Sequence, residues 1–430
     1  MRYWIALVFT LCLSTPSFAA TCTHYVSPGG HSDTPSDSNA GTNITLPWAT
    51  LGKMTSTAVA GNVVCMRGGT FARTTILNFP NSGTAANRIT FQGYQAETAI
   101  VSYPGWSSGW NSNYSTTQNF VAYITFENFT MSGATFAFHM FGANNIIWSR
   151  VTILNSGSGI LGHCWRCTID RSTLYHNGWG GGTPSSTDHN LYIYGNEWVV
   201  TNNLLYDAGG SNITFSCGDH NVTLPSTLYS GCANSIIANN TIAYSANGPA
   251  IFLWAGESSL QAYNNVISEN NIFLQNNTVG VDTGGIYLRS MPSDTGLLVR
   301  NNLFWDTTGV TTNICVNNPL LNCSNSTFGG YWTSTNNLFG VNPLLVNAPT
   351  TKPTTPDFNF TASSPIAPSG PVNFGLNLTG TITTTLDYGG VQRPVGGAWD
   401  LGAYEFGTTP DTTPPAAPTG LRITRLLGGR

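Results

Sequence analysis

Six short segments of the chain carry histidine, tyrosine, tryptophan and arginine at matching positions. The segments are residues 136–139, 160–163, 191–194, 213–216, 251–254 and 286–289, and each has an apolar residue or glycine at its first and third positions. Alternation along a strand would place the second and fourth residues on one outer face, and neighbouring strands lie about 4.8 Å apart. We therefore expect one continuous strip, made of Ala137, Leu161, Tyr192, Thr214, Phe252 and Tyr287, then His139, His163, Tyr194, Ser216, Trp254 and Arg289.

The side chains of this strip have the chemistry of a sugar-binding surface. Aromatic faces stack on the apolar C–H faces of sugar rings, and tyrosine, histidine and arginine groups hydrogen-bond hydroxyls or carboxylates. A large outward-facing apolar row usually marks a binding site. The alternative is that long loops cover the strip, which would make it a satellite core. We predict that a linear polysaccharide binds through His139, Tyr192, Tyr194, Phe252, Trp254, Tyr287 and the neighbouring His189.

Groups that could cleave a polysaccharide lie on the strip and in the loops that flank it. A glycoside hydrolase needs two carboxyl groups roughly 5–10 Å apart, and Asp219 and Glu257 are the pair that we predict. A polysaccharide lyase needs a base, and a cation beside the carboxylate of the sugar. His163 and Arg289 are the candidates for these roles. Each histidine alone could equally be an ordinary hydrogen-bonded turn or surface residue.

No spacing in the sequence demands a metal ion. Asp188, Asp219 and Asp294 stand in the flanking loops, and their carboxylates are of the ligand type that calcium prefers. Calcium therefore stays open as a cofactor, and we predict no particular metal site.

The elements that must position the strip repeat along the chain. An Asn-Asn pair, followed by two apolar residues or by Thr-Ile, begins at positions 202, 239, 270, 301 and 336, at intervals of 37, 31, 31 and 35 residues. A period of this size indicates a solenoid. Because the repeats contain short β-branched and aromatic runs without helical periodicity, we predict coils of short strands, which stack as a parallel β-helix.

The asparagine pairs mark the bend between two strands of each coil. Asparagine tolerates the left-handed backbone region that a sharp bend needs, and amides stacked from coil to coil can hydrogen-bond to one another. The alternative is ordinary turn asparagine without such bonds. Charged residues just before the bend of their coils, such as Glu127, Asp170 and Glu269, are interpreted as members of surface ion pairs. We predict an amide ladder through Asn203, Asn240, Asn271, Asn302 and Asn337.

Composition and the first residues of the chain bear on its location. The net charge of −4, with 8% charged residues, argues against nucleic acid and anionic membranes as partners. Residues 1–20 read as a signal peptide, with Arg2 before an apolar run that is too short to span a bilayer and small residues before Ala20. We expect a secreted, periplasmic or cell-surface protein without a transmembrane segment, acting as a monomer.

Eight of the nine cysteines lie beyond the predicted signal peptide. An even number in an exported chain indicates disulfides. Connectivity stays open at this point, and the two cysteines at 164 and 167 could also form a redox or metal half-site. The pairings between near neighbours are Cys22–Cys65, Cys164–Cys167, Cys217–Cys232 and Cys315–Cys323.

Both ends of the repeat region resemble a known family. The run HYVSPGG…PWATLGKMTSTAVAGNVVCMRGGTF resembles the N-terminal cap of secreted right-handed β-helix proteins of the pectate-lyase-like superfamily. LDYGGVQRPVGGAWDLGAYEF resembles the closing segment of many secreted β-helix proteins. The resemblance covers roughly residues 23–406. It implies an all-β fold, a right-handed parallel β-helix, with a helical cap that runs from Pro47 to about Ala60 and plugs one end.

The resemblance and the repeats together predict how the chain is divided. We expect a signal peptide at 1–20, an N-terminal cap with a short helix at 21–74, and β-helix coils at 75–345. A closing segment follows at 346–406, and a Thr/Pro-rich linker or disordered tail at 407–430.

The functional hypothesis is a secreted carbohydrate-active protein, either a polysaccharide lyase or a glycoside hydrolase. Related lyases often use lysine or arginine with calcium. The two lysines here, Lys53 and Lys352, lie outside the repeat region, so a lysine-based lyase mechanism is disfavoured. One fold hosts many functions. A non-catalytic carbohydrate-binding or adhesion protein on the same scaffold is therefore the alternative.

Overall fold

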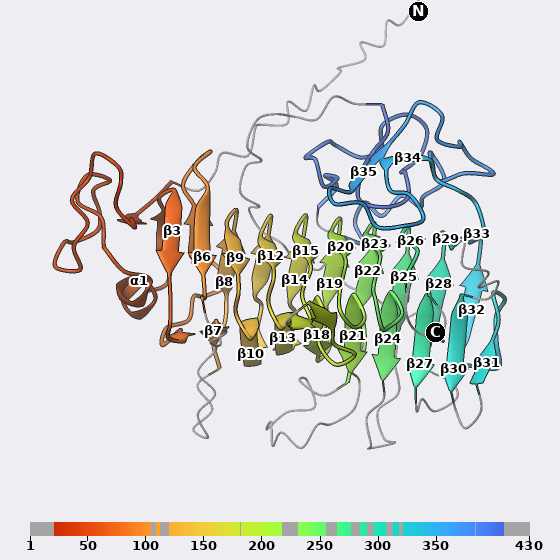
Figure 1. Cartoon of the computed structure of the whole chain (residues 1–430), viewed down its shortest axis with the longest axis horizontal. Coiled ribbons are helices and arrows are strands. Elements are labelled where there is room, and N and C mark those ends of the chain that lie inside the picture. Colours follow the sequence, from red (N-terminus) through yellow and green to blue (C-terminus); the bar gives the residue numbers. More distant parts are fainter. Residues whose placement is uncertain are drawn as a thin grey trace, which may run out of the picture.

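Three long sheets of mostly parallel strands make up the protein. The computed structural model describes residues 21–104, 109–111, 120–180, 182–216, 231–254, 265–276, 284–289, 296–306, 313–317, 321–382 and 384–407. Sheet I has 11 strands, and sheets II and III have 10 each. Each coil passes through sheets I, II and III in turn, so the chain winds as the right-handed parallel β-helix that the sequence predicted (Figure 1).

The strands are short, and each sheet gains one strand from almost every coil. Sheet I contains β1 (His24–Val26), β2 (Val63–Met66), β5 (Ile89–Gly93), β8 (Ile124–Glu127), β11 (Ile147–Ser149), β14 (Thr168–Asp170), β19 (Val199–Thr201), β22 (Ile236–Ala238), β25 (Val266–Glu269), β28 (Leu297–Arg300) and β32 (Trp332–Thr335). Sheet II contains β3 (Gly69–Ala72), β6 (Ala99–Ser102), β9 (Thr130–Ser132), β12 (Thr152–Leu154), β15 (Thr173–Tyr175), β20 (Leu204–Tyr206), β23 (Thr241–Ala243), β26 (Ile272–Leu274), β29 (Leu303–Trp305) and β33 (Leu338–Phe339). Sheet III contains β4 (Leu77–Asn78), β7 (Trp110–Asn111), β10 (Phe136–Asn144), β13 (Ser158–Trp165), β18 (Leu191–Tyr194), β21 (Ile213–Ser216), β24 (Ile251–Trp254), β27 (Ile286–Arg289), β30 (Ile314–Asn317) and β31 (Leu321–Cys323).

The predicted asparagine ladder is confirmed at the corner between sheets I and II. The first asparagine of each pair has a left-handed backbone, with φ between 50° and 56°. The second turns its amide inward, and Asn240 Nδ2 donates to Asn271 Oδ1 at 3.0 Å. The same bond joins Asn203 to Asn240, Asn271 to Asn302 and Asn302 to Asn337. The bends of neighbouring coils are therefore bonded to one another.

A second asparagine ladder, which the sequence did not reveal, lies between sheets II and III. Asn177 Nδ2 donates to Asn190 Oδ1 at 2.8 Å, Asn190 to Asn212 at 2.7 Å, and Asn212 to Asn276 at 2.9 Å. All four side chains are buried. This ladder fixes the start of the sheet III strands, which carry the predicted strip.

The charged residues beside the first ladder are buried, which corrects their interpretation as surface ion pairs. Glu127, Asp170 and Glu269 are all less than 4% exposed. Coil stacking is the reason, because each carboxylate lies against side chains of the next coil. Asp170 Oδ1, for example, accepts hydrogen bonds from Thr201 Oγ1 and Asn202 Nδ2.

The helix near the N-terminus is shorter than predicted. α1 (Leu51–Thr57) begins after Thr50, whose backbone is extended and whose side-chain oxygen accepts a hydrogen bond from the Lys53 N–H. Pro47 therefore precedes the helix. α1 lies beside the first coils in Figure 1 and buries Met54 in the core. The strands β1, β2 and β3, within the segment predicted as a cap, already belong to sheets I and II.

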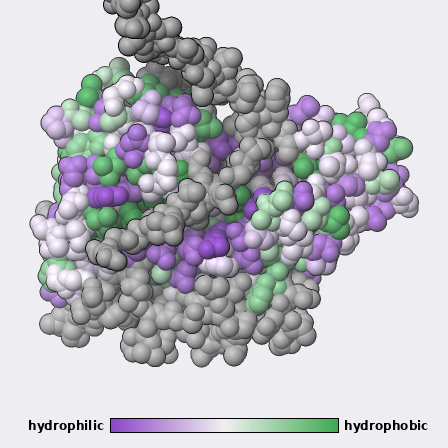
Figure 2. Space-filling model, turned by 180° about the vertical axis from the view of Figure 1, so that it is seen from behind, coloured by the Kyte–Doolittle hydropathy of each residue, from purple (hydrophilic) through white to green (hydrophobic). Residues whose placement is uncertain are grey.

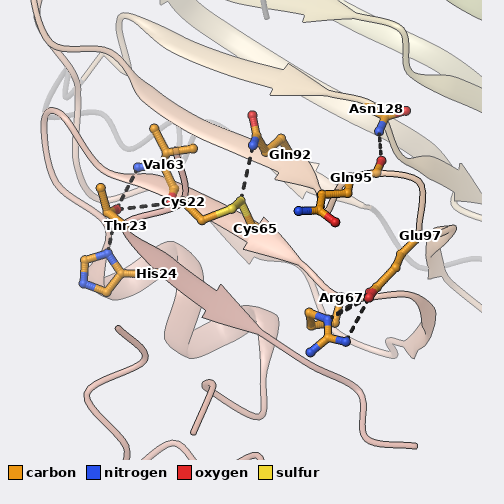
Figure 3. The surroundings of a disulfide bond; sticks show 10 residues. All are labelled: Cys22, Thr23, His24, Val63, Cys65, Arg67, Gln92, Gln95, Glu97 and Asn128. Atoms are coloured by element: carbon orange, nitrogen blue, oxygen red, sulfur yellow. Dashed lines mark hydrogen bonds and ion pairs between the residues drawn. A yellow bond between two sulfur atoms is a disulfide. The ribbon is translucent and has the colours of Figure 1, made fainter. Parts of the chain in front are cut away.

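Disulfides tie the first and last coils. Figure 3 shows Cys22 bonded to Cys65 of β2, where Gln92 of β5 donates to the sulfur of Cys65 and the Arg67–Glu97 ion pair lies nearby. The pairings Cys164–Cys167 and Cys315–Cys323 are also confirmed. Cys232 is disulfide-bonded, and its expected partner Cys217 lies outside the described residues.

The closing segment folds back over sheet II. It contains the hairpin of β34 (Leu345–Asn347) and β35 (Asp357–Phe360), which Figure 1 shows beside the strands β20 to β29. Phe358 and Leu401 of this segment pack with Leu274 and Leu303 of sheet II in a second apolar cluster. The outer face of sheet II is therefore covered in its C-terminal half.

The rest of the surface is mixed in character. The coloured residues in Figure 2, seen from behind, combine hydrophilic and hydrophobic types over the whole face. Within the described ranges, no helix has the length and apolar character needed to cross a membrane. The disulfides fit an oxidising compartment, as expected for an exported protein.

Candidate functional site

The predicted strip lies on the outer face of sheet III and is in register. Tyr192 of β18 pairs with Thr214, which pairs with Phe252 and then with Tyr287. The fourth column runs through His163, Tyr194, Ser216, Trp254 and Arg289. Side chains from five successive coils therefore form one surface, because the short strands of sheet III keep the same register from coil to coil.

His139 does not belong to the column in which it was placed. It pairs with Leu161, and Phe136 pairs with Ser158, so β10 is shifted by two residues from the predicted register. The ladder is irregular between Met140 and Ala143. A shift of two residues keeps each side chain on its face, so His139 still points outward but stands in the column of Tyr192.

The strip is half-buried rather than open. His163 and Tyr194 are each 5% exposed, and Tyr287 is 7% exposed. The side chains of intermediate exposure are His139, Tyr192, Phe252 and Trp254, and Arg289 is exposed. Any ligand would thus first meet Arg289 and the half-buried rings.

The rings of the strip stack on one another. The imidazole of His163 lies parallel to the Tyr194 ring, with centroids 4.0 Å apart, and Phe141 packs on it at 5.0 Å. Phe252 and Tyr287 stack at 5.6 Å on the neighbouring coils. These two groups of stacked rings, with Thr214 and Ser216 between them, are compatible with sugar rings, whose C–H faces need flat apolar partners.

Burial disfavours the charged forms of His139, Tyr192 and Tyr194. It lowers the pKa of His139 to about 4 and raises the pKa of Tyr192 above its ordinary value. Burial also raises the pKa of Tyr194. His139 therefore offers a neutral imidazole, which can accept or donate one hydrogen bond to a hydroxyl group.

His189 lies beside the strip and is fully buried. Its Nδ1 accepts a hydrogen bond of 3.0 Å from the backbone N–H of Ser211, and its ring meets Tyr192 edge-on at 5.2 Å. Burial lowers the pKa of His189 to about 4, although Asp188 opposes this. The residue supports β18 from below the surface, and a direct contact with a polysaccharide is a prediction that its burial does not favour.

His189 makes stability depend on pH. The unfolded chain binds a proton on this imidazole below about pH 6.5, but the folded chain does so only below about pH 4. The contribution of neutral His189 to the free energy of unfolding is therefore complete above pH 6.5 and is lost as the pH falls to 4. The free energy of unfolding should fall between pH 7 and 4. We expect His189→Asn, which keeps an acceptor for the Ser211 N–H, to make this fall smaller by roughly 2–3 kcal/mol. Urea unfolding at both pH values measures this, and parallel losses in the two proteins would contradict it.

Two predicted catalytic groups cannot be placed. Asp219 and Glu257 lie outside the described residues, as does Asp294. Asp188 is placed, and its Oδ1 accepts a hydrogen bond from Ser158 Oγ at 3.2 Å. In the part of the chain that the structure describes, no group of three metal-ligating side chains comes together. Calcium and the hydrolase pair therefore stay predictions.

Lys352 reaches the coils, although it lies outside the repeats in the sequence. Its Nζ is 2.5 Å from Asp207 Oδ2, which also contacts Nδ1 of His176 at 2.7 Å. Trp179 stacks on the imidazole of His176 at 5.2 Å and donates its indole N–H to the Asp207 carbonyl. An amine, a carboxylate, an imidazole and an indole thus meet at the ends of β15 and β20.

Sequence reasoning missed this cluster because Lys352 comes from the closing segment, 145 residues after Asp207. The coils themselves contain no lysine, but Lys352 approaches them from the closing segment. No spacing in the sequence indicated this cluster. The rarity of lysine was the one feature that could have drawn attention to Lys352. The ion pair with Asp207 occupies the amine, so Lys352 serves first to hold the closing segment on sheet II.

Comparisons with known proteins concern the fold. No family model and no curated protein matches the sequence. Similar solved structures include a rhamnogalacturonan lyase, with 15% identity and a TM-score of 0.45 over 80% of this chain and 97% of that chain. XylC in complex with xylose has 11% identity and a TM-score of 0.47 over 74% and 75%. Pectate lyase Pel9A has 15% identity and a TM-score of 0.40 over 90% and 97%. At these identities no residue role carries over to this chain.

Proposed function

We propose that the protein is an exported carbohydrate-active protein that binds a polysaccharide along the outer face of sheet III. The observation that carries the proposal is the in-register column of Tyr192, Phe252 and Tyr287, with Trp254 and Arg289 beside it. Coils repeat about every 4.8 Å, so a linear chain of sugars can contact several coils at once. The rings would stack on the sugars, and Arg289 would bind hydroxyl or carboxylate groups.

Cleavage of the bound chain is the finer part of the proposal. In a lyase, Arg289 would neutralise a uronate carboxylate and His163 would take the neighbouring proton. In a hydrolase, Asp219 and Glu257 would act as the carboxyl pair. Arg289 suits its role because it is exposed at the edge of the strip. His163 would need its ring to move out from between Phe141 and Tyr194.

A non-catalytic role is the second candidate, and the packing of His163 favours it. The ring is covered by Tyr194 on one side and contacts Phe141 as well. A stacked imidazole that is 5% exposed has little freedom to take a proton from a substrate. The strip would then hold a polysaccharide without cleaving it.

A polysaccharide panel separates these candidates. Each polymer is incubated with the protein, with and without calcium, and reducing ends and absorbance near 235 nm are measured. Reducing ends together with absorbance mean a lyase, and reducing ends alone mean a hydrolase. Binding without either signal means the non-catalytic role. If no polymer in the panel binds or is cleaved, the proposed function is wrong.

Trp254 provides a direct test of the strip. We expect Trp254→Ala to weaken binding of the recognised polysaccharide about tenfold, since one lost aromatic contact is worth about 0.5–1.5 kcal/mol beyond its buried area. Affinity electrophoresis or calorimetry measures the change. Tyr331→Ala, directly before β32 of sheet I and outside sheet III, is the matched aromatic control. Equal affinity of Trp254→Ala and the wild type would rule out the strip as the binding surface.

A further inference from the structure

A cleft lies where the β34–β35 hairpin meets the outer face of sheet II. Its volume is about 530 Å³, which falls in the usual range for small-ligand sites. The sheet contributes Leu204 and Tyr206 of β20, and Tyr404 follows from the end of the closing segment. The hairpin contributes the remaining wall, which includes Asn347, Asp357 and Asn359. This cleft is separate from the strip on sheet III.

The lining combines aromatic rings with hydrogen-bond acceptors. Tyr206 packs on Phe358 with centroids 5.4 Å apart, and Tyr175 of the preceding coil stacks on Tyr206 at 4.9 Å. The rings therefore form a continuous surface that leads from the open part of sheet II into the cleft. Flat aromatic faces beside polar groups are what a sugar ring requires.

The polar groups of the hairpin present their acceptor oxygens. Asp357 Oδ1 accepts hydrogen bonds from the backbone N–H and the Nδ2 of Asn359, at 2.9 and 2.7 Å. Asn347 uses its Nδ2 for the carbonyl of Thr355. The Nδ2 of each amide thus donates one hydrogen bond within the hairpin. Among the described residues, no donor is bonded to Asp357 Oδ2 or to the amide oxygens of Asn347 and Asn359.

Charge decides which ligand fits. Among the described residues that line the cleft, Asp357 carries the one charged side chain. Its carboxylate would repel a uronate, whereas free acceptor oxygens attract the O–H donors of a neutral sugar. The nearby Lys352 amine does not reverse this balance, because it is paired with Asp207.

We propose that the cleft between the hairpin and sheet II is a second saccharide site, which takes one or two sugar units of a neutral oligosaccharide. Asp357 and Asn359 bind the hydroxyl groups, and Tyr206 stacks on a ring. Lys352 is a positioning residue, because its bond to Asp207 and the bond of Tyr244 to the Pro349 carbonyl hold the hairpin on the sheet. The site stands independently of any activity on sheet III.

Calorimetry with cellobiose, xylobiose, galactobiose and digalacturonate tests the proposal on the full protein. We expect at least one neutral disaccharide to bind and digalacturonate to bind this cleft at least tenfold more weakly. Asp357→Asn keeps the shape but removes the charge, and it should relax this discrimination. Val346→Trp fills the cleft from an exposed position and should reduce binding of the neutral sugar at least tenfold.

Two controls separate this site from the strip. Ile366→Trp adds the same bulk at another exposed position of the closing segment and should leave binding unchanged. Trp254→Ala should weaken binding of the polysaccharide to sheet III but not binding of the disaccharide to the cleft. The proposal is overturned if no neutral disaccharide binds at millimolar concentration, or if Val346→Trp binds it as the wild type does. Disaccharide binding that Trp254→Ala abolishes would assign it to sheet III instead.

Discussion

Replacing Arg393 by methionine is expected to cost about 3–5 kcal/mol and to release the closing segment from sheet II. The Arg393–Glu405 pair is entirely buried, with 0% of either side chain exposed. Arg393 Nη1 donates to Glu405 Oε1 at 2.6 Å, and Nη2 donates to the Gly402 carbonyl at 2.8 Å. Methionine would fill much of the volume but leave the carboxylate buried without its cation.

The surroundings make this loss large. Asp400 and Asp387 lie buried beside Glu405, and burial, with Glu405 as a neighbour, raises the pKa of Asp400 to about 7. Arg393 opposes that shift. Without the guanidinium, three carboxyl groups would share one buried site, so some must take up a proton or the segment must open to water.

Urea unfolding and hydrogen exchange measure the result. Exchange should accelerate first in residues 341–406, before the coils lose protection. Arg166→Met is the matched control, because the Arg166–Glu197 pair is half-exposed and should contribute less than about 1 kcal/mol. Similar losses for the two variants would show that burial of the Arg393 pair does not hold the segment.

Binding measurements on Arg393→Met also test whether the cleft depends on the closing segment. The cleft exists only while the hairpin lies on sheet II. Arg393→Met should therefore weaken disaccharide binding as well as the attachment of the closing segment. Polysaccharide binding on sheet III should persist, because its strands belong to the coils. A loss of both would mean that the closing segment stabilises the whole solenoid.

The sequence predicted contacts between coils where the same residue type recurs in the same local sequence. The Asn203 to Asn337 ladder could be predicted because each member follows another asparagine at a nearly constant interval. Asn177, Asn190, Asn212 and Asn276 bond just as closely, but at separations of 13, 22 and 64 residues. Loops of different lengths intervene, so their coincidence in space left no pattern in the sequence.

The sequence allowed us to predict which face of the sheet carries the site, but not how deeply its side chains are buried. Alternation placed Tyr192, Phe252 and Tyr287 on one outer face, and even the two-residue error at His139 kept that face, since strands have a period of two. Burial depends on which segments lie across a sheet. For the same reason Lys352, which arrives from a distant hairpin, could not be assigned to Asp207 from spacing.

Asn271→Ala is expected to cost about 3–5 kcal/mol, because it leaves several buried groups without partners. Asn271 is fully buried, and its Oδ1 accepts from the backbone N–H and Nδ2 of Asn240, at 2.9 and 3.0 Å. Its Nδ2 donates to the Ile237 carbonyl at 2.8 Å and to Asn302 Oδ1 at 3.0 Å. No water can replace these bonds in the packed interior of the solenoid.

The last rung supplies the control. Asn337 makes the same kinds of bond to Asn302 and to the Val299 carbonyl, but it is only half-buried. Water can satisfy its partners, so Asn337→Ala should cost about half as much. Urea unfolding of both variants gives the comparison. If the central and terminal substitutions cost the same, the amide bonds do not hold neighbouring coils together, and apolar packing alone must fix the register that aligns the outer face of sheet III.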